Sequence, residues 1–143
     1  MNPAPATLSD LIGRTPIVCE GEPGDDELNI VCQDGSRWRL YHDRDFCESV
    51  RIESIEGDLS DLVGMPIAIA EEVSSHGRAP DGYEPAPEDS PSDSWTWTFY
   101  KFATAKGHVT IRWLGESNGY YSESVDFGRM SDVEVTRAKE PTR

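Results

Sequence analysis

Residues 8–13 read Leu-Ser-Asp-Leu-Ile-Gly, and residues 59–64 read Leu-Ser-Asp-Leu-Val-Gly. A Pro-Ile pair follows each stretch, with a difference of one residue in the spacing between Gly and Pro. Later in the chain, and in the same order, Glu-Ser-Val occurs at residues 48–50 and again at residues 123–125. Similar stretches in a fixed order indicate an internal duplication. We therefore expect two units, repeat 1 at about residues 7–57 and repeat 2 at about residues 58–138.

Each repeat is predicted to begin with a short helical turn. Its leucines share one face, and Gly13 or Gly64 ends it in a left-handed conformation. The proline after each glycine cannot continue a helix, so the chain should leave as a strand at residues 17–19 and 67–70.

The middle of repeat 1 predicts an antiparallel hairpin. Residues 28–32 and 37–41 are rich in strand-forming side chains, and they flank Asp34-Gly35, a favoured tight turn.

The middle of repeat 2 predicts a second hairpin, with strands at residues 95–103 and 109–114 around Lys106-Gly107. The alternation of side chains is clear here, because successive residues of a strand point to opposite faces. One face should carry Trp95, Trp97 and Phe99, and the other Thr96, Thr98, Tyr100 and Phe102.

Further strands are expected at residues 121–127, extending this meander, and at residues 132–137, at an edge. Residues 20–27, the Pro- and Ser-rich stretch 74–94 and the tail 139–143 read as mobile loops or ends. The fold predicted for residues 1–143 is a single α+β domain. It is β-rich, with two duplicated units of a short helix plus an antiparallel β-meander packed pseudo-symmetrically.

The charge is strongly acidic and unevenly distributed. The chain of 143 residues has a formal net charge of −14. Residues 1–72 hold 16 Asp and Glu against 5 Lys and Arg, whereas residues 73–143 hold 11 against 8. Binding to a nucleic-acid backbone needs clustered cations, so we expect no direct nucleic-acid binding. Such a chain suits docking on basic surfaces, although charge that only maintains solubility is the simpler alternative.

Cellular location is inferred from what the chain lacks. No apolar run is long enough to span a membrane, and no secretory signal is visible at the start. An odd number of cysteines, Cys19, Cys32 and Cys47, without zinc-site spacing favours reduced thiols and a cytoplasmic protein with no cofactor.

The first candidate site is a polar cluster after the first hairpin, made of His42, Asp43, Asp45, Cys47 and Glu48. Imidazole, thiol and carboxylate groups could form a metal site. A Cys47–His42 nucleophile pair is a second alternative. The third is a polar turn in which the aspartates make turn hydrogen bonds and Cys47 points into the core.

The second candidate site lies between residues 113 and 123, where small residues alternate with aromatic and polar ones that could contact a ligand or partner. Its candidate binding residues are Trp113, Glu116, Asn118, Tyr120, Tyr121 and Glu123. A hairpin turn with packed aromatic residues explains the same pattern. Because both clusters lie next to a Glu-Ser-Val stretch, they could face each other across a pseudo-two-fold axis.

Four stretches resemble a family of small uncharacterised proteins of bacteriophages and bacterial genomes. They are Cys-Glu-Ser-Val at residues 47–50, the stretch from Gly57 to Ile67, Thr-Trp-Thr-Phe-Tyr-Lys at residues 96–101 and the stretch 113–123. The resemblance spans about residues 8–127. Phe46 stands where members often have a second cysteine, which weakens a dithiol or metal role. The resemblance implies a phage or prophage accessory gene, without a mechanism.

Three functions remain open. The first is a non-enzymatic accessory protein that binds, and could inhibit, a host or defence protein with a basic surface, its acidic half acting as a nucleic-acid mimic in the host-cell cytoplasm. The second is a small-ligand binder with a pocket between the repeats, lined by His42, Asp45, Trp113, Asn118 and Tyr121. The third is a metal-dependent enzyme that uses the cluster from His42 to Glu48.

Overall fold

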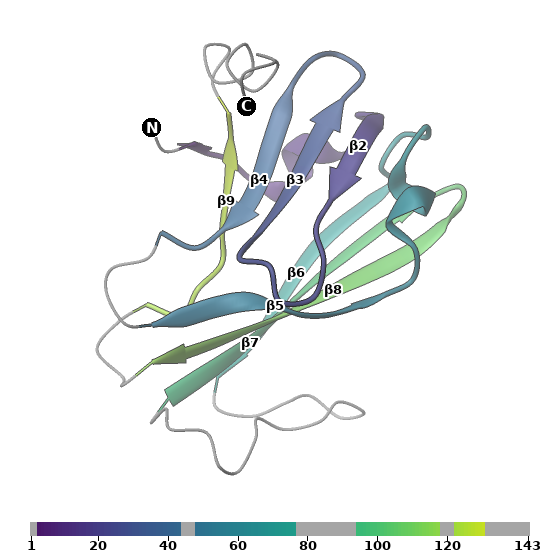
Figure 1. Ribbon diagram of the computed structural model, residues 1–143. Coiled ribbons are helices and arrows are strands. Elements are labelled where there is room, and N and C mark those ends of the chain that lie inside the picture. The colour runs from purple at the N-terminus through teal and green to yellow at the C-terminus, as the bar shows by residue number, and fades with distance from the viewer. Residues whose placement is uncertain (1–2, 44–47, 77–93, 118–121, 131–143) are drawn as a thin grey trace, which may run out of the picture.

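The computed structural model describes residues 3–43, 48–76, 94–117 and 122–130, and it shows two antiparallel sheets packed face to face (Figure 1). The first sheet has five strands in the spatial order β1 (Ala4–Pro5), β9 (Asp126–Arg129), β4 (Arg37–Tyr41), β3 (Glu27–Cys32) and β2 (Pro16–Glu20). The second has four strands in the order β5 (Ser49–Glu56), β8 (Gly107–Ser117), β7 (Ser94–Thr104) and β6 (Ile69–His76).

The core lies between the two sheets. Strands β3 and β4 alternate buried and half-buried residues, as expected for strands with one face on a core. Their buried side chains, Trp38 among them, meet Tyr100, Ile111 and Trp113 from the four-stranded sheet. The five-stranded sheet is therefore held to the four-stranded one by a shared apolar layer.

Both predicted hairpins are present. The first joins β3 to β4 through a turn in which Gly35 has a φ of 88°, and this left-handed value explains why glycine stands there. The second joins β7 to β8, which pair along their full length. Ser94 lies opposite Ser117 at one end, and Thr104 lies opposite Gly107 at the other. Tyr100 and Phe102 of this hairpin enter the core. Trp97 and Phe99 form a separate buried cluster with Leu114, as the alternation predicted.

The predicted helical turns are single 3₁₀ turns, η1 (Leu8–Leu11) and η2 (Leu59–Leu62). Gly13 and Gly64 have φ values of 88° and 90°, so both glycines take the predicted left-handed conformation. The Gly13 N–H donates to the Ile67 carbonyl at 2.8 Å, and the Gly64 N–H donates to the Pro16 carbonyl at 2.8 Å. The glycine after each turn is therefore hydrogen-bonded to the segment that follows the other turn.

Several expectations differ from the structure. The β-rich part of the fold class is confirmed, but the described residues contain no α-helix, so the α+β label is not. Strand β5 was not predicted, and β6 continues to His76, so the predicted loop 74–94 begins within a strand. Strand β9 does not extend the meander, because it pairs with β1 and β4 in the other sheet. The edge strand expected at residues 132–137 and the tail lie outside the described residues.

Candidate functional site

His42 joins three separate parts of the chain. It follows β4, and its Nε2 lies 2.8 Å from Oε2 of Glu48, directly before β5. Its Nδ1 lies 2.8 Å from the carbonyl oxygen of Ser124, in the segment that leads to β9. The His42 side chain is 4% exposed and that of Glu48 is 0% exposed. His42, a candidate residue predicted after the first hairpin, is thus a buried side chain that connects the two sheets.

The hydrogen bonds fix the position of one proton in this pair and require a second. A carbonyl oxygen only accepts, so Nδ1 of His42 carries a hydrogen and donates it to Ser124. The contact between Nε2 and Glu48 then needs one further proton, which belongs either to an imidazolium or to a carboxylic acid. Either arrangement leaves the buried pair without net charge and so avoids the large cost of an uncompensated buried carboxylate.

Glu123, in the second Glu-Ser-Val stretch, is also a buried carboxylate. It is 8% exposed and accepts hydrogen bonds from the hydroxyls of Thr96, at 2.7 Å, and Ser117. The segment packs closely on β8, because a Cβ added at Gly115 would lie 2.5 Å from the Glu123 carbonyl oxygen. Glycine is therefore required where β8 passes under Glu123.

The two Glu-Ser-Val stretches meet at one end of the molecule. Val50 of the first stretch pairs with Gly115, and Gly115 packs against Glu123 of the second. Ser124 receives the hydrogen bond from His42, which also contacts Glu48. The structure thus brings together three of the predicted site residues, His42, Glu48 and Glu123.

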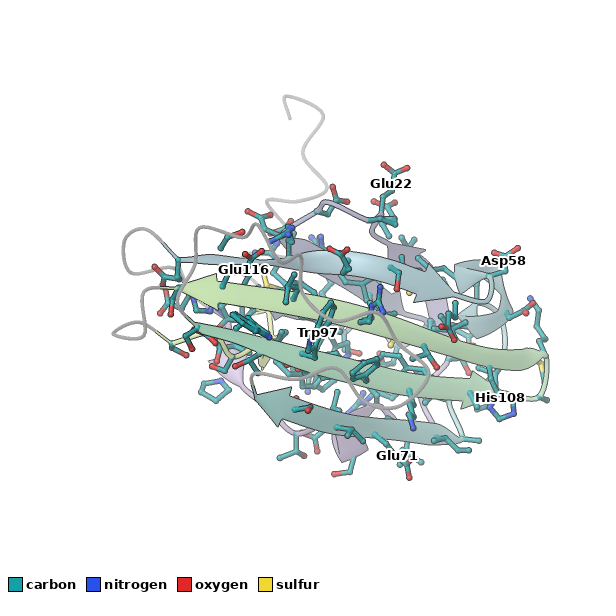
Figure 2. All side chains as sticks on the ribbon, turned by 90° about the horizontal axis from the view of Figure 1, so that it is seen from below. Glu22, Asp58, Glu71, Trp97, His108 and Glu116 are labelled. Atoms are coloured by element: carbon teal, nitrogen blue, oxygen red, sulfur yellow. The ribbon has the colours of Figure 1, made fainter. Side chains whose placement is uncertain are left out.

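Other predicted residues are placed elsewhere. Trp113 is 0% exposed in the core between the sheets, so it is out of reach of a ligand at the surface. Glu116 lies on the outer face of the four-stranded sheet, where Figure 2 labels it, and its Oε1 lies 3.0 Å from Nη2 of Arg51. Asp43 is exposed, and its N–H donates to the Asp126 carboxylate at 3.2 Å. Asp45, Cys47, Asn118, Tyr120 and Tyr121 lie outside the described residues.

A hollow of about 370 Å³ opens beside the His42–Glu48 pair. Its wall is polar and includes Asp25, Asp26 and Arg51. Both ring nitrogens of His42 are already hydrogen-bonded. Among the described residues, no group of three or more His, Cys, Asp and Glu side chains is arranged to hold a metal ion.

The acidic loop, residues 20–27, borders this hollow. Its exposed carboxylates are those of Glu20, Glu22, Asp25 and Asp26, and Glu27 lies half-buried at its end. We expected it to be mobile, but it is bonded to the edge of β5. The Gly24 N–H donates to the Ile52 carbonyl at 2.7 Å, and the Ile52 N–H donates to the Asp25 carbonyl at 2.8 Å.

The charge of the acidic loop is largely uncompensated. Arg39 lies 3.6 Å from Glu27, but the four exposed carboxylates form no ion pair within the described part of the chain. The sequence pattern did not indicate this surface as a site, because residues 20–27 are typical of a mobile loop. The available signal was five carboxylates in eight residues without one cation.

The described cysteines are not reactive groups. Cys19 and Cys32 are free thiols. Burial, reinforced by Cys32, raises the pKa of Cys19 to about 12, and burial also raises the pKa of Cys32. Neither thiol ionises near neutral pH, so neither suits nucleophilic chemistry.

A family model described as "Domain of unknown function (DUF7448)" matches residues 9–127. No curated protein and no solved structure matches the chain. Across the described segments, no helix is long and apolar enough to cross a membrane.

Proposed function

We propose that this chain, which belongs to the DUF7448 family of domains of unknown function, is a non-enzymatic module that binds a protein with a basic surface through its acidic loop. Because the sequence resembles phage-type accessory proteins, we propose that this partner is a host or defence protein, bound in the cytoplasm of the cell that expresses the chain. An inhibitor that occupies a nucleic-acid-binding surface is the form of the proposal that best fits the charge.

The observation that carries the proposal is the fixed acidic loop. Glu20, Glu22, Asp25 and Asp26 are exposed, and backbone bonds to Ile52 hold the loop in place. A rigid acidic surface loses little conformational entropy on binding. Its field also attracts a basic partner over several ångströms and raises the association rate.

The buried His42–Glu48 pair lies next to the acidic loop. The hollow beside the acidic loop is lined by Asp25, Asp26, His42 and Glu48. His42 and Glu48 tie the end of β4 to the start of β5, and β5 contains Ile52, to which the acidic loop is hydrogen-bonded. Their role in the proposal is to position the acidic loop, not to perform chemistry.

We further propose that repeats 7–57 and 58–138 arose by duplication. The reciprocal bonds Gly13 to Ile67 and Gly64 to Pro16 support this, because Gly13 and Gly64 end the two similar stretches and each donates to the Pro-Ile pair of the other repeat. Thr7 and Asp58 likewise directly precede η1 and η2. The two glycines, at equivalent positions in the repeats, thus make reciprocal contacts.

The test is affinity capture from host lysate at low and at high salt. Wild type is compared with Glu22→Gln/Asp26→Asn, which removes two charges from the acidic loop, and with Glu56→Gln/Glu71→Gln, which removes two from exposed sites on the four-stranded sheet. We expect a basic partner that wild type and the control retain at low salt and that the loop variant loses. Equal retention by all three proteins, or a complex that survives high salt, would overturn the proposal.

A further inference from the structure

The structure has a second hollow, of about 460 Å³. It is lined by residues 5–8, Tyr41, Glu72 and residues 125–127, and it shares no lining residue with the hollow beside His42. Four separate parts of the chain form it: the segment from β1 into η1, the end of β4, the edge strand β6 and the start of β9. Its volume lies within the usual range of small-ligand sites.

Two carboxylates face this hollow, from different sheets. Glu72 comes from β6, and Asp126 comes from the first position of β9. No lysine, arginine or histidine is among its lining residues, all of which are described. The tyrosines nearby respond to the negative field. Burial, reinforced by Asp126, raises the pKa of Tyr41, and burial together with Glu72 raises the pKa of Tyr100.

Apart from Thr7, the rest of the wall consists of apolar and aromatic residues. Tyr41 and Phe127 provide ring surfaces, and Phe127 is held in place by stacking on Trp38 with ring centroids 5.6 Å apart. Leu8 and Val125 add aliphatic surface. Carboxylates beside aromatic rings attract cations, and the aliphatic wall suits an alkyl stem that carries such a charge.

We infer that the hollow between Glu72 and Asp126 is a binding site for an organic cation, a guanidinium or primary ammonium group on an alkyl stem. The cation would pair with the two carboxylates while its stem packs on Leu8, Tyr41 and Phe127. This chemistry is found in small amines and in the arginine and lysine side chains of proteins. The site goes beyond the acidic loop and does not depend on that loop binding a partner.

The first experiment uses the full chain and n-butylguanidinium, with n-butylurea as a neutral probe of nearly the same shape. Backbone amide chemical shifts are followed by NMR for wild type, Glu72→Gln and Glu71→Gln. Glu71 is the matched control, because it neighbours Glu72 in β6 but lies opposite Lys101 in the strand register, and Figure 2 labels it on the outer side of the four-stranded sheet.

We expect n-butylguanidinium to shift amides at residues 5–8, 72 and 125–127 in wild type and in Glu71→Gln. Glu72→Gln should weaken this binding up to roughly fivefold, the factor that corresponds to about 1 kcal/mol for an ion pair at an exposed carboxylate. The neutral probe should bind weakly or not at all. Shifts spread over the acidic surface, equal binding of both probes, or equal weakening by the two substitutions would overturn the inference.

A second experiment distinguishes the source of the cation. Capture from lysate is repeated with wild type in the presence of excess n-butylguanidinium chloride and, separately, of excess n-butylurea with sodium chloride at the same ionic strength. Release of a bound protein by the guanidinium alone identifies an arginine or lysine side chain as the natural occupant. A small amine bound to the protein in native mass spectrometry, and lost in Glu72→Gln, identifies a free cation. Either result supports the site independently of the acidic loop variants.

Discussion

Replacing His42 by alanine should destabilise the protein strongly. The substitution removes two buried hydrogen bonds, to Glu48 and to the Ser124 carbonyl, from a side chain that is 4% exposed. It also leaves the Glu48 carboxylate, 0% exposed, without its histidine. Breaking a buried pair from one side costs about 3–5 kcal/mol. A domain of this kind is stable by only about 5–15 kcal/mol, so the loss should be evident in the unfolding midpoint.

Glu48→Gln should cost much less, about 1 kcal/mol. The glutamine amide can donate to Nε2 of a neutral His42, whose Nδ1 hydrogen still reaches Ser124. In the double variant the absent histidine no longer leaves a charge behind. The two substitutions should therefore couple by about 2 kcal/mol, and the double variant should be more stable than the sum of the single losses indicates.

The assay is urea unfolding at pH 7, followed by circular dichroism, for wild type, both single variants and the double variant. An unchanged m-value will show that the denatured state is comparable among them. A loss below about 1 kcal/mol for His42→Ala, or strictly additive losses, would refute the argument that the pair shares one buried proton.

Three further predictions concern single sites. Gly115→Ala places a Cβ 2.5 Å from the Glu123 carbonyl oxygen and should cost about 1–3 kcal/mol in urea unfolding, whereas a change within 0.5 kcal/mol would contradict the close packing. Gly64→Ala meets no neighbouring atom but requires a φ of 90°, so it should cost about 1 kcal/mol, and a neutral or stabilising effect would count against the left-handed turn. The Cys19 thiol should resist iodoacetamide at pH 8.5 in the folded state, as judged by peptide mass mapping. Because its pKa of about 12 lies above that of an unfolded thiol, its contribution to stability should decrease as pH rises from about 9 towards 12, an alkaline slope that Cys19→Ala should reduce.

Local patterns in the sequence predicted the local structure well. Asp34-Gly35 between two alternating stretches gave the first hairpin, because that turn depends only on adjacent residues. The same holds for the faces of β7, where Trp97 and Tyr100 point in opposite directions. Gly13 and Gly64 were predicted from the pattern that ends a helical turn.

Long-range pairing could not be predicted in the same way. Strand β9 follows β8 in the chain but pairs with β4, a choice set by partners that no local pattern encodes. The strand β5 was missed because its residues carry several charges and show only weak alternation. Sequence alone likewise left His42 open between metal ligand, base and turn residue, since its contact with Ser124 spans 82 positions.

The acidic loop shows the opposite error. Its glycines, proline and carboxylates are typical of a mobile loop, and composition alone favoured that interpretation. The structure bonds Gly24 and Asp25 to Ile52, so the same residues form a fixed surface. The loop is held in place because β5 is an edge strand with free backbone groups, a feature that composition does not reveal.

The most direct test of the central claim is the salt dependence of affinity for the captured partner. The dissociation constant is measured at several salt concentrations for wild type, Glu22→Gln/Asp26→Asn and Glu56→Gln/Glu71→Gln. Binding through the acidic loop predicts that affinity falls steeply with salt for wild type and for the control, and that the loop variant binds more weakly with a shallower slope. An identical slope and affinity for all three proteins would contradict the account.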